Sequence, residues 1–428
     1  MIFHIGLDDT DSEEGMCTTY VGAVIRDELK EIGIESVDYP HLIRLNPNWK
    51  WKTRGNCAVS LILDVKENEI PKVKRIALEK VEELAELQIE ETTPGVAFYQ
   101  GEDIPEKLKN FSKKVIQKVA TLEEAEKVAE EVGADYEKFR EGRGIIGALA
   151  AIGHTLKEDY TYELIPYREE QNRGEPRRLD DDSVWKMDKL TYPSTFDNVD
   201  PEAGEVSIAP HTPCPILYGI RSESPDDAFE AREIVTEEEP VERMALFKTN
   251  QGTDEHLQSK SIEEIEPYES VIVEGTVLDS PVTIDGGHVF FSIEDQGYEM
   301  RCSAFEPTRE FRKVIRELVE GDKVKVFGGV KEKEEHPLTI NLEKIEILDL
   351  TPVKEEVNPR CGGCGKRMKS AGQEKGYYCE KCGTRLPSGS SEKIEKNREI
   401  EERLYEVPPR ARRHLAKPMV RDRNQENS

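Results

Sequence analysis

Long apolar runs are missing from this chain of 428 residues. No stretch of about 18 consecutive apolar residues occurs, so the sequence offers no candidate transmembrane helix and predicts no membrane partner. Residues 1–5 lead directly into an acidic loop, without the basic start and long apolar stretch of a secretory signal peptide. We therefore expect a cytoplasmic protein.

The phosphate-binding motif Gly-x-x-x-x-Gly-Lys-Ser/Thr is absent as well, which excludes the chemistry of P-loop nucleotide enzymes. Cysteine is scarce, with eight residues in the chain. Four of them are scattered, and a lone thiol is more often a small buried apolar group than a nucleophile. These scattered cysteines are Cys17, Cys57, Cys214 and Cys302.

The other cysteines form two C-x2-C pairs separated by 14 residues: Cys361, Cys364, Cys379 and Cys382. In a chain without a secretory signal, such spacing indicates a metal site and not a disulfide framework. Four thiolates fill the tetrahedral coordination of Zn²⁺ and leave no open position for catalysis, so we predict a zinc ribbon with a structural metal. Lys and Arg residues beside Tyr377 and Tyr378 favour a nucleic-acid contact over a purely structural role.

Positive charge is in short supply, because 60 Lys and Arg stand against 88 Asp and Glu, a formal net charge of −28. Such a field repels nucleic-acid phosphates. From Pro359 to the C-terminus, 17 basic residues face 10 acidic ones, a net charge of +7, which leaves −35 on the rest. This asymmetry favours a local nucleic-acid contact, although acidity can equally reflect a saline or hot cytoplasm. The tail from Pro408 is expected to be disordered unless RNA orders it.

Helix and strand patterns alternate through the first part of the chain and predict an α/β domain. Strands are expected at residues 3–6, 41–45 and 58–65, and helices at 18–32, 69–87 and 121–140. An apolar segment of small residues follows at 142–153. A second group comes after it, with a strand at 160–166 and a short helix at 226–233.

From residue 270 the pattern changes to short strands. Five are expected, at 271–276, 288–293, 298–304, 323–328 and 338–348, with a helix at 311–318 between the third and the fourth. This order is typical of an OB-fold barrel. Beyond the cysteine cluster, a charged helix is expected at 392–405.

The first expected strand ends in the acidic loop Asp8-Asp9-Thr10-Asp11-Ser12. Closely spaced carboxylates after a strand suit Mg²⁺ held together with nucleotide phosphates, because this hard cation prefers oxygen ligands. Gly15 and the helix N-terminus at Thr18 and Thr19 add backbone N–H donors for an anion. On composition alone, a solvated turn that caps the helix is an equally good interpretation.

Two further polar segments are candidates for binding. Trp51-Lys52-Thr53-Arg54-Gly55-Asn56 places a Lys and an Arg beside a Gly turn, as phosphate clamps often require. Residues 248–257 combine Asn250 and Gln251 with a Gly turn. This segment is either a solvated loop or a site for a polar ligand or a base edge.

Taken together, these segments resemble one family, the archaeal tRNA 2-agmatinylcytidine synthetases. The matching stretches are 5–12, 15–20, 44–47, 51–56, 142–153 and 249–254, and the resemblance extends over nearly the whole chain. It implies a multidomain α/β fold with five parts in order. These are an ATP-dependent kinase-like α/β domain at 1–138, a ferredoxin-like α+β domain at 139–265, an OB-fold β-barrel at 266–352, a zinc ribbon at 358–386 and a basic C-terminal helix and tail at 387–428.

The resemblance also implies a reaction. ATP phosphorylates the 2-carbonyl of the wobble cytidine in the isoleucine tRNA with a CAU anticodon, and agmatine displaces the phosphate, so that AUA is read in place of AUG. The implied site consists of Asp8, Asp9 and Asp11 on Mg²⁺ and the triphosphate, and of Thr18 as an autophosphorylated threonine. Lys52 and Arg54 steady phosphate charge, and Ser12, Gly15 and Thr19 complete the nucleotide-binding set.

Two other classes of function stay open on the residues alone. A non-catalytic binder of single-stranded nucleic acid would use the OB-fold and the ribbon, but it leaves the first 260 residues without a role. A small-molecule kinase would use the acidic loop and keep the other modules for assembly. ATP hydrolysis stimulated by tRNA would exclude the binder, and phosphorylation of a free metabolite without tRNA would support the kinase.

Overall fold

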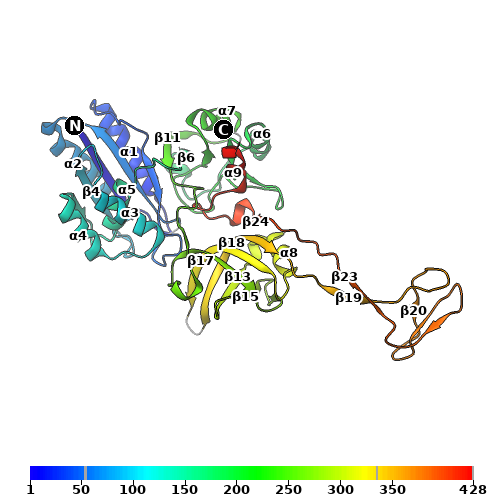
Figure 1. Cartoon of the computed structure of the whole chain (residues 1–428). Coiled ribbons are helices and arrows are strands. Elements are labelled where there is room, and N and C mark those ends of the chain that lie inside the picture. The colour runs from blue at the N-terminus through cyan, green and yellow to red at the C-terminus, as the bar shows by residue number, and fades with distance from the viewer. Residues whose placement is uncertain (53–54, 334–335, 427–428) are drawn as a thin grey trace.

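A nine-stranded sheet connects the first two parts of the chain in the computed structural model, which describes residues 1–52, 55–333 and 336–426 (Figure 1). In spatial order its strands are β5 (Asp135–Lys138), β4 (Gly95–Gln100), β1 (Ile2–Asp8), β3 (Cys57–Asp64), β2 (His41–Arg44), β11 (Val241–Thr249), β6 (Thr161–Arg168), β10 (Ile220–Ser222) and β7 (Thr195–Phe196). All neighbours are antiparallel except β2 and β11, whose parallel contact joins the two parts.

The front part, β1 to β5, is a three-layer α/β unit. Phe3, Ile5 and Leu7 of β1 pack under α1 (Thr18–Glu31) and α2 (Ile70–Leu84). The opposite face is covered by α3 (Glu106–Gln117), α4 (Leu122–Val132) and α5 (Ile145–Gly153). The predicted strands and the first two helices are confirmed.

The predicted helix at 121–140 is too long. A capping box of Thr121 and Glu124 starts α4, and Gly133, with a φ of 69° in the left-handed region, ends it. Residues Asp135–Lys138 then form the edge strand β5. The glycine therefore converts the second half of the charged stretch into a strand.

The second part has the element order of a ferredoxin-like fold: β6, α6 (Asp181–Thr191), β7, β10, α7 (Pro225–Ile234) and β11. Its two helices lie against the same four-stranded half of the sheet. A small hairpin of β8 (Val199–Asp200) and β9 (Glu205–Val206) extends from the connection between β7 and β10.

The OB-fold barrel is confirmed. β13 (Ser270–Val277), β17 (Lys323–Lys333), β18 (His336–Asp349), β16 (Tyr298–Ala304) and β15 (Val289–Asp295) form the sheet, and pairing of β15 with β13 closes it. Helix α8 (Phe311–Arg316) lies between β16 and β17 in sequence, as predicted. The short strands β12 (Leu257–Ser259), β14 (Val282–Thr283) and β24 (Leu404–Glu406) extend the barrel sheet.

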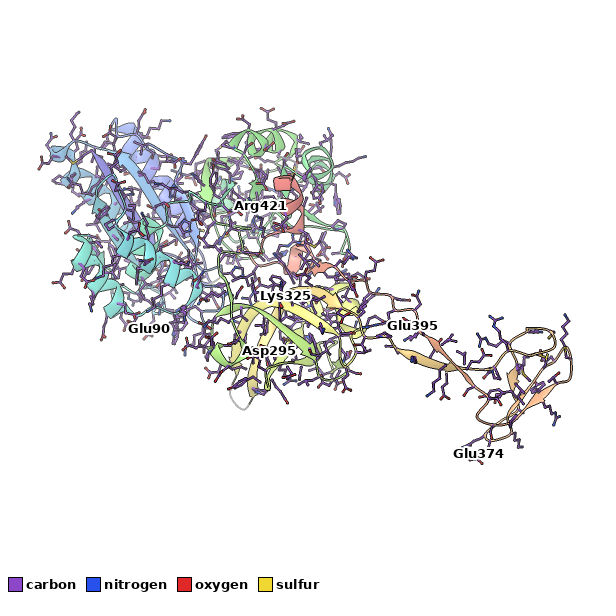
Figure 2. The ribbon with its side chains drawn as sticks, viewed as in Figure 1. Glu90, Asp295, Lys325, Glu374, Glu395 and Arg421 are labelled. Atoms are coloured by element: carbon purple, nitrogen blue, oxygen red, sulfur yellow. The ribbon has the colours of Figure 1, made fainter. Side chains whose placement is uncertain are left out.

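The ribbon stands at the end of an arm, away from the rest of the molecule (Figure 1). The arm is the antiparallel pair β19 (Lys354–Val357) and β23 (Glu392–Glu395), and the ribbon contains β20 (Lys369–Ser370), β21 (Tyr377–Tyr378) and β22 (Arg385–Leu386). Figure 2 shows Glu374 on the ribbon and Glu395 on the arm, both remote from Asp295 on the barrel.

The predicted helix at 392–405 is wrong. Its first residues form β23 on the arm, and its last residues form β24 beside β18 of the barrel. Both ends find a strand partner far away in sequence, so tertiary pairing overrides the helical pattern of the charged residues.

The C-terminal tail is ordered, which corrects the prediction of a disordered basic segment. After the turn at Pro409–Ala411, the chain returns along the ferredoxin-like part and ends in the short helix α9 (Met419–Glu426) (Figure 1). Leu415 and Ala416 are buried, and Arg421, labelled in Figure 2, pairs with Glu223 and Asp159. A basic tail on an acidic body therefore satisfies its charges within the molecule. In the described ranges we find no helix with the length and apolar character needed to cross a membrane.

Close approach of α5 to the front sheet predicts a strong effect of Gly6→Ala. A Cβ at Gly6 would lie 2.1 Å from the carbonyl oxygen of Ala148 in α5. We expect a loss of about 2–3 kcal/mol from this overlap in the core, measured as a lower urea midpoint. Gly33→Ala is the control, because its Cβ meets nothing within 4 Å and tests only the left-handed backbone, at about 1 kcal/mol. Equal losses at the two positions would contradict the role given to the contact.

Candidate active site

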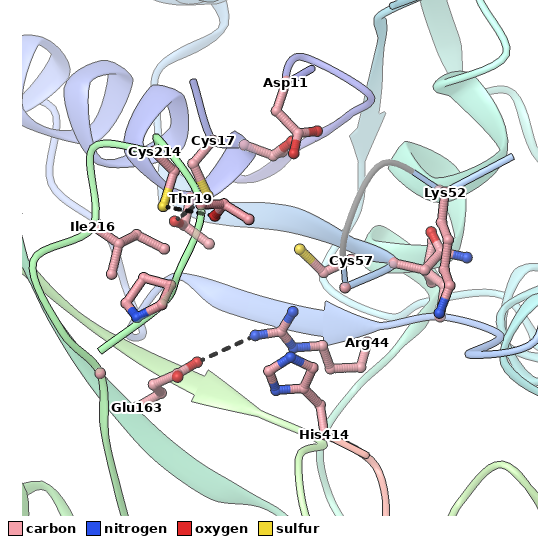
Figure 3. A pocket seen from close by; sticks show the side chains of 18 of the residues that line it. Asp11, Cys17, Thr19, Arg44, Lys52, Cys57, Glu163, Cys214, Ile216 and His414 are labelled. Atoms are coloured by element: carbon pink, nitrogen blue, oxygen red, sulfur yellow. Dashed lines mark hydrogen bonds and ion pairs between the residues drawn. The ribbon is translucent and has the colours of Figure 1, made fainter. Parts of the chain in front are cut away.

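A cavity of about 540 Å³ lies between the front part, the ferredoxin-like part and the C-terminal tail (Figure 3). Carboxylates, cations and hydroxyl groups from distant segments line it together. Among the charged and hydroxyl residues of its wall are Asp8, Asp9, Asp11, Thr18, Thr19, Arg44, Lys52, Arg143, Glu163, Asp197, Arg221, Arg412 and His414. The acidic loop, the Lys52 segment and the tail thus share one site.

Asp8 ends strand β1 on the face covered by α5. A Cβ at Gly147 would lie 1.9 Å from Oδ2 of Asp8, so only glycine lets this helix pass the carboxylate. Burial, and then the negative charge of Asp9, raise the pKa of Asp8 well above its usual range. A buried carboxyl group next to a second carboxyl group favours the binding of a cation beside them.

Asp9 turns the chain away from the strand, with a φ of 60°. Its backbone N–H donates to Oδ1 of Asp8 at 2.7 Å. Its own Oδ2 accepts from the hydroxyl of Thr93 at 2.9 Å and from Nη2 of Arg143 at 3.1 Å. These two contacts to Oδ2 fix the orientation of the Asp9 carboxylate, and with it the position of Oδ1. Arg143 is a site residue that the sequence prediction missed.

Thr18 and Thr19, at the start of α1, both line the cavity. The hydroxyl of Thr10 donates to Oγ1 of Thr18 at 3.1 Å. Ser12 and Gly15 have a different place, because they close the turn of the acidic loop and do not belong to the cavity wall. The N–H of Ser12 donates to the carbonyl of Gly15 at 3.1 Å, so the two residues shape the loop that carries Asp11.

Lys52 reaches the cavity from the loop after β2, as Figure 3 shows. Its Nζ donates to the carbonyl of Pro47 at 2.6 Å. Partial burial, followed by the charge of Arg413, lowers the pKa of Lys52 to about 8. Arg54, the second predicted phosphate clamp, lies outside the described residues.

Residues 248–257 are not a solvated loop. Thr249, Asn250 and Gln251 are fully buried. Asn250 holds the backbone of Arg44 through both ends of its amide, at 2.8 and 3.1 Å. Gln251 donates to Glu163 of β6, which lies 3.6 Å from Nη2 of Arg44 (Figure 3). The segment therefore positions charged residues of the cavity wall.

The tail adds two side chains, Arg412 and His414, that local sequence patterns did not identify. Arg412 pairs with Asp197, which also pairs with Arg221 at 3.2 Å. Nη2 of Arg221 donates to Nδ1 of His414 at 2.6 Å, and the same nitrogen lies 3.1 Å from Oε1 of Gln251. Burial and the surrounding cations hold the pKa of His414 well below its usual range. The only sequence signal that the tail packs against the rest of the molecule is the apolar pair Leu415-Ala416 inside a basic segment.

The four ribbon cysteines form a separate candidate metal centre. One ligand atom from each lies within 4.8 Å of all the others, and Sγ of Cys364 and Sγ of Cys379 are 3.6 Å apart. Tetrahedral Zn²⁺ bound by thiolates at about 2.3 Å requires sulfur separations of about 3.8 Å, so the cluster fits this ion. Backbone N–H groups of Gly363 and Cys364 lower the pKa of Cys361 to about 6, which favours the thiolate ligand.

Four family models match the chain. The model described as the TiaS TCKD domain matches residues 4–141, and the TiaS FLD domain matches 142–256. An OB-fold nucleic acid binding domain matches 271–348, and the TiaS C-terminal zinc ribbon domain matches 358–400. Together they account for most of the chain.

Relatives and solved structures agree with these models. The chain is 49% identical to the tRNA(Ile2) 2-agmatinylcytidine synthetase TiaS of Pyrococcus horikoshii, over 98% of this chain and 97% of the relative. A crystal structure of the TiaS–tRNA(Ile2)–ATP complex superposes with a TM-score of 0.86 at 43% identity, covering 98% and 97% of the two chains. A complex of TiaS with tRNA(Ile2), AMPCPP and agmatine gives 0.85 at 40% identity, with the same coverage. The resemblance drawn from the motifs is confirmed, and the chain belongs to the family of tRNA(Ile2) 2-agmatinylcytidine synthetases.

Proposed function

We propose that this protein converts the wobble cytidine of the CAU-anticodon isoleucine tRNA into 2-agmatinylcytidine, with ATP and agmatine as co-substrates. One observation carries the proposal: a single cavity joins the acidic loop to a wall of cations, in a chain that also bears an OB-fold and a ribbon. The acidic loop suits a metal–nucleotide complex and a cationic amine, and the two modules suit RNA. The reaction belongs in the cytoplasm, where tRNA and ATP meet.

The chemistry requires activation, because the 2-carbonyl oxygen of cytosine is a very poor leaving group. Phosphoryl transfer to this oxygen forms an O–P bond and turns it into a phosphate ester. The primary amine of agmatine then attacks C2 and loses a proton, and the C2–O bond breaks with release of phosphate. The phosphate that agmatine displaces is one of the two phosphates formed from ATP. The other is released when water cleaves the second phosphoanhydride bond, so that ATP ends as AMP and two phosphates.

The acidic loop would hold the triphosphate. Asp8, Asp9 and Asp11 offer oxygen ligands for Mg²⁺, and the raised pKa of Asp8 fits a site that is completed by a cation. Mg²⁺ bound there would neutralise phosphate charge. Arg143, fixed by Asp9, and Lys52 extend into the same cavity and would stabilise charge on the transferring phosphoryl group.

Thr18 is the proposed phosphate acceptor within the protein. Its hydroxyl lies at the first residue of α1, bonded to Thr10 and facing the cavity that contains the acidic loop. A phosphate there would also meet the N-terminal end of the α1 dipole. Ser12, Gly15 and Thr19 support this arrangement by shaping the loop and the start of the helix.

Modification of the tRNA is the first test. Isoleucine tRNA with a CAU anticodon is incubated with enzyme, Mg-ATP and agmatine, and its nucleosides are analysed by mass spectrometry. We expect a mass gain at the wobble cytidine that requires both ATP and agmatine. ATP consumption without modification would support a small-molecule kinase, and the absence of both would favour a non-catalytic binder.

Asp9→Asn tests the acidic loop. The substitution removes the charge that holds Arg143 and the proposed Mg²⁺, so we expect kcat to fall by at least about 100-fold. The affinity for tRNA should stay within a few-fold of the wild-type value in a filter-binding assay. Glu13→Gln, an exposed residue of the same loop, is the control and should keep full activity. Unchanged turnover in Asp9→Asn would remove Asp9 from the site.

Cys364→Ser tests the ribbon. We expect the bound zinc, measured by atomic emission, to fall from about one ion per chain to none, because three thiolates hold Zn²⁺ much more weakly than four. The unfolding midpoint of the barrel and the front part should not change, since the ribbon stands on its own arm. Weaker tRNA binding is expected with it. Unaltered affinity would show that the ribbon serves only as a structural element.

A further inference from the structure

Three cations from separate regions of the chain meet beside Pro47 and Asn48. Nζ of Lys52 donates to the carbonyl of Pro47 at 2.6 Å, and Nζ of Lys331, on strand β17 of the barrel, donates to the carbonyl of Asn48 at 3.0 Å. Arg413 of the tail donates through Nη1 to the side-chain oxygen of Asn48. The front part, the barrel and the tail each contribute one cation to this group, which we call the Asn48 cation cluster.

The cluster carries uncompensated charge. Within residues 1–52, 55–333 and 336–426, no carboxylate forms an ion pair with Lys52 or Lys331, and Arg413 shares Glu343 with His256. Elsewhere on β17, by contrast, Lys323 and Lys325 each face a carboxylate. In a protein with 28 more acidic than basic residues, two unpaired lysines beside an arginine indicate an absent anion.

Asn48 is built to hold these cations together. It is fully buried, and its amide nitrogen donates to the carbonyl of Glu269 at 2.8 Å and to the hydroxyl of Ser270 at 2.9 Å. This leaves its side-chain oxygen for Arg413. A Cβ at Gly329 would come within 2.2 Å of that oxygen and 2.6 Å of the guanidinium, so β17 admits the pair only with glycine at this position.

An exposed aromatic ring adjoins the cluster. Trp51, next to Lys52 in sequence, exposes 54% of its surface, with Nζ of Lys50 5.1 Å from its ring centroid. The guanidinium of Arg143 lies 6.0 Å from the same ring. Cations beside an exposed ring are the combination with which proteins hold single-stranded nucleic acid, through its phosphates and its bases.

Repulsion among the three cations favours binding of an anion at the Asn48 cation cluster. Burial, followed by the charge of Arg413, lowers the pKa of Lys331 to about 8, as it does for Lys52. Their partners at present are backbone carbonyls, which do not neutralise charge. A phosphate would supply the missing negative charge and would favour the protonated form of both amines.

We propose that Lys331 and Arg413 bind one backbone phosphate of the RNA strand whose nucleotide enters the cavity, while the neighbouring Lys52 faces the transferring phosphoryl group from the cavity wall. The inference rests on the proposed function, since it takes RNA as the substrate. A phosphate of the nucleotide triphosphate shares the same chemistry. Two observations favour the RNA: Lys331 and Arg413 lie outside the cavity wall, and Lys331 belongs to the barrel.

Lys331→Gln in the full-length protein tests the cluster, with Lys323→Gln as the matched control on the same strand. Direct binding of the unmodified tRNA is measured at several salt concentrations. We expect Lys331→Gln to weaken binding about 10-fold and to lower the slope of log Kd against log salt by about 1, as for one lost phosphate contact. The KM for ATP and the maximal rate at saturating tRNA should not change, and Lys323→Gln should behave as wild type.

The position of the phosphate is tested with tRNAs that carry one neutral methylphosphonate in the anticodon loop. At one position the substitution should weaken binding to the wild type more than binding to Lys331→Gln, because the variant has already lost one of the cations around that phosphate. Wild-type affinity of Lys331→Gln, or equal losses for both proteins at every position, would overturn the proposal. A higher KM for ATP with intact tRNA affinity would assign the cluster to the triphosphate. Because binding is measured without turnover, a wild type that binds tRNA and does not modify it would disprove only the proposed function.

Discussion

The backbone of helix α5 lies against strands β1 and β4 at distances that only glycine permits, and the active site depends on this contact. A Cβ at Gly95 would meet the backbone nitrogen of Ile145 at 2.0 Å, and one at Gly144 would meet the carbonyl of Asp8 at 2.5 Å. The helix therefore closes one side of the acidic loop directly. Gly147 of α5 lies directly against Oδ2 of Asp8. The packing of α5 on the sheet therefore also fixes the position of the Asp8 carboxylate. A larger side chain in this segment would displace the loop together with the helix.

Charge balance within the molecule explains the second half of the site. An acidic body attracts its own basic tail, and the tail returns along the ferredoxin-like part, where Arg412 pairs with Asp197 and Arg421 with Glu223. These arginines are almost fully buried, so loss of one partner would leave a buried charge without compensation. The tail is therefore a fixed part of the cavity wall, which places His414 there. Several basic residues of the tail are thus neutralised by carboxylates within the molecule.

Local patterns were sufficient for much of this structure. Strand β1 and the acidic loop follow from an apolar run that ends in carboxylates, and the cysteine spacing fixes the ribbon. Burial of residues 248–257 could not be predicted, because a polar segment is buried only when distant partners satisfy it, and the partner of Asn250 is Arg44, 206 residues away. The tail was missed for the same reason. The helix expected at 392–405 failed because β19 and β18 offer strand pairing at its two ends, which no window of sequence contains.

Buried polar contacts also connect the barrel to the cavity. Glu343 of β18 accepts from His256 at 2.9 Å and pairs with Arg413 at 3.3 Å, and these contacts hold its pKa at about 2 despite burial. Lys344, the next residue of β18, pairs with Asp254. The contacts with His256 and Asp254 join the barrel to residues 248–257, the segment that holds Arg44. One network of contacts therefore positions the barrel and the cavity wall. Such contacts have strict geometry and fail when one partner moves. RNA seated on the barrel would thus reach the cavity at a fixed distance, whereas the ribbon stands apart from this network on its two-stranded arm.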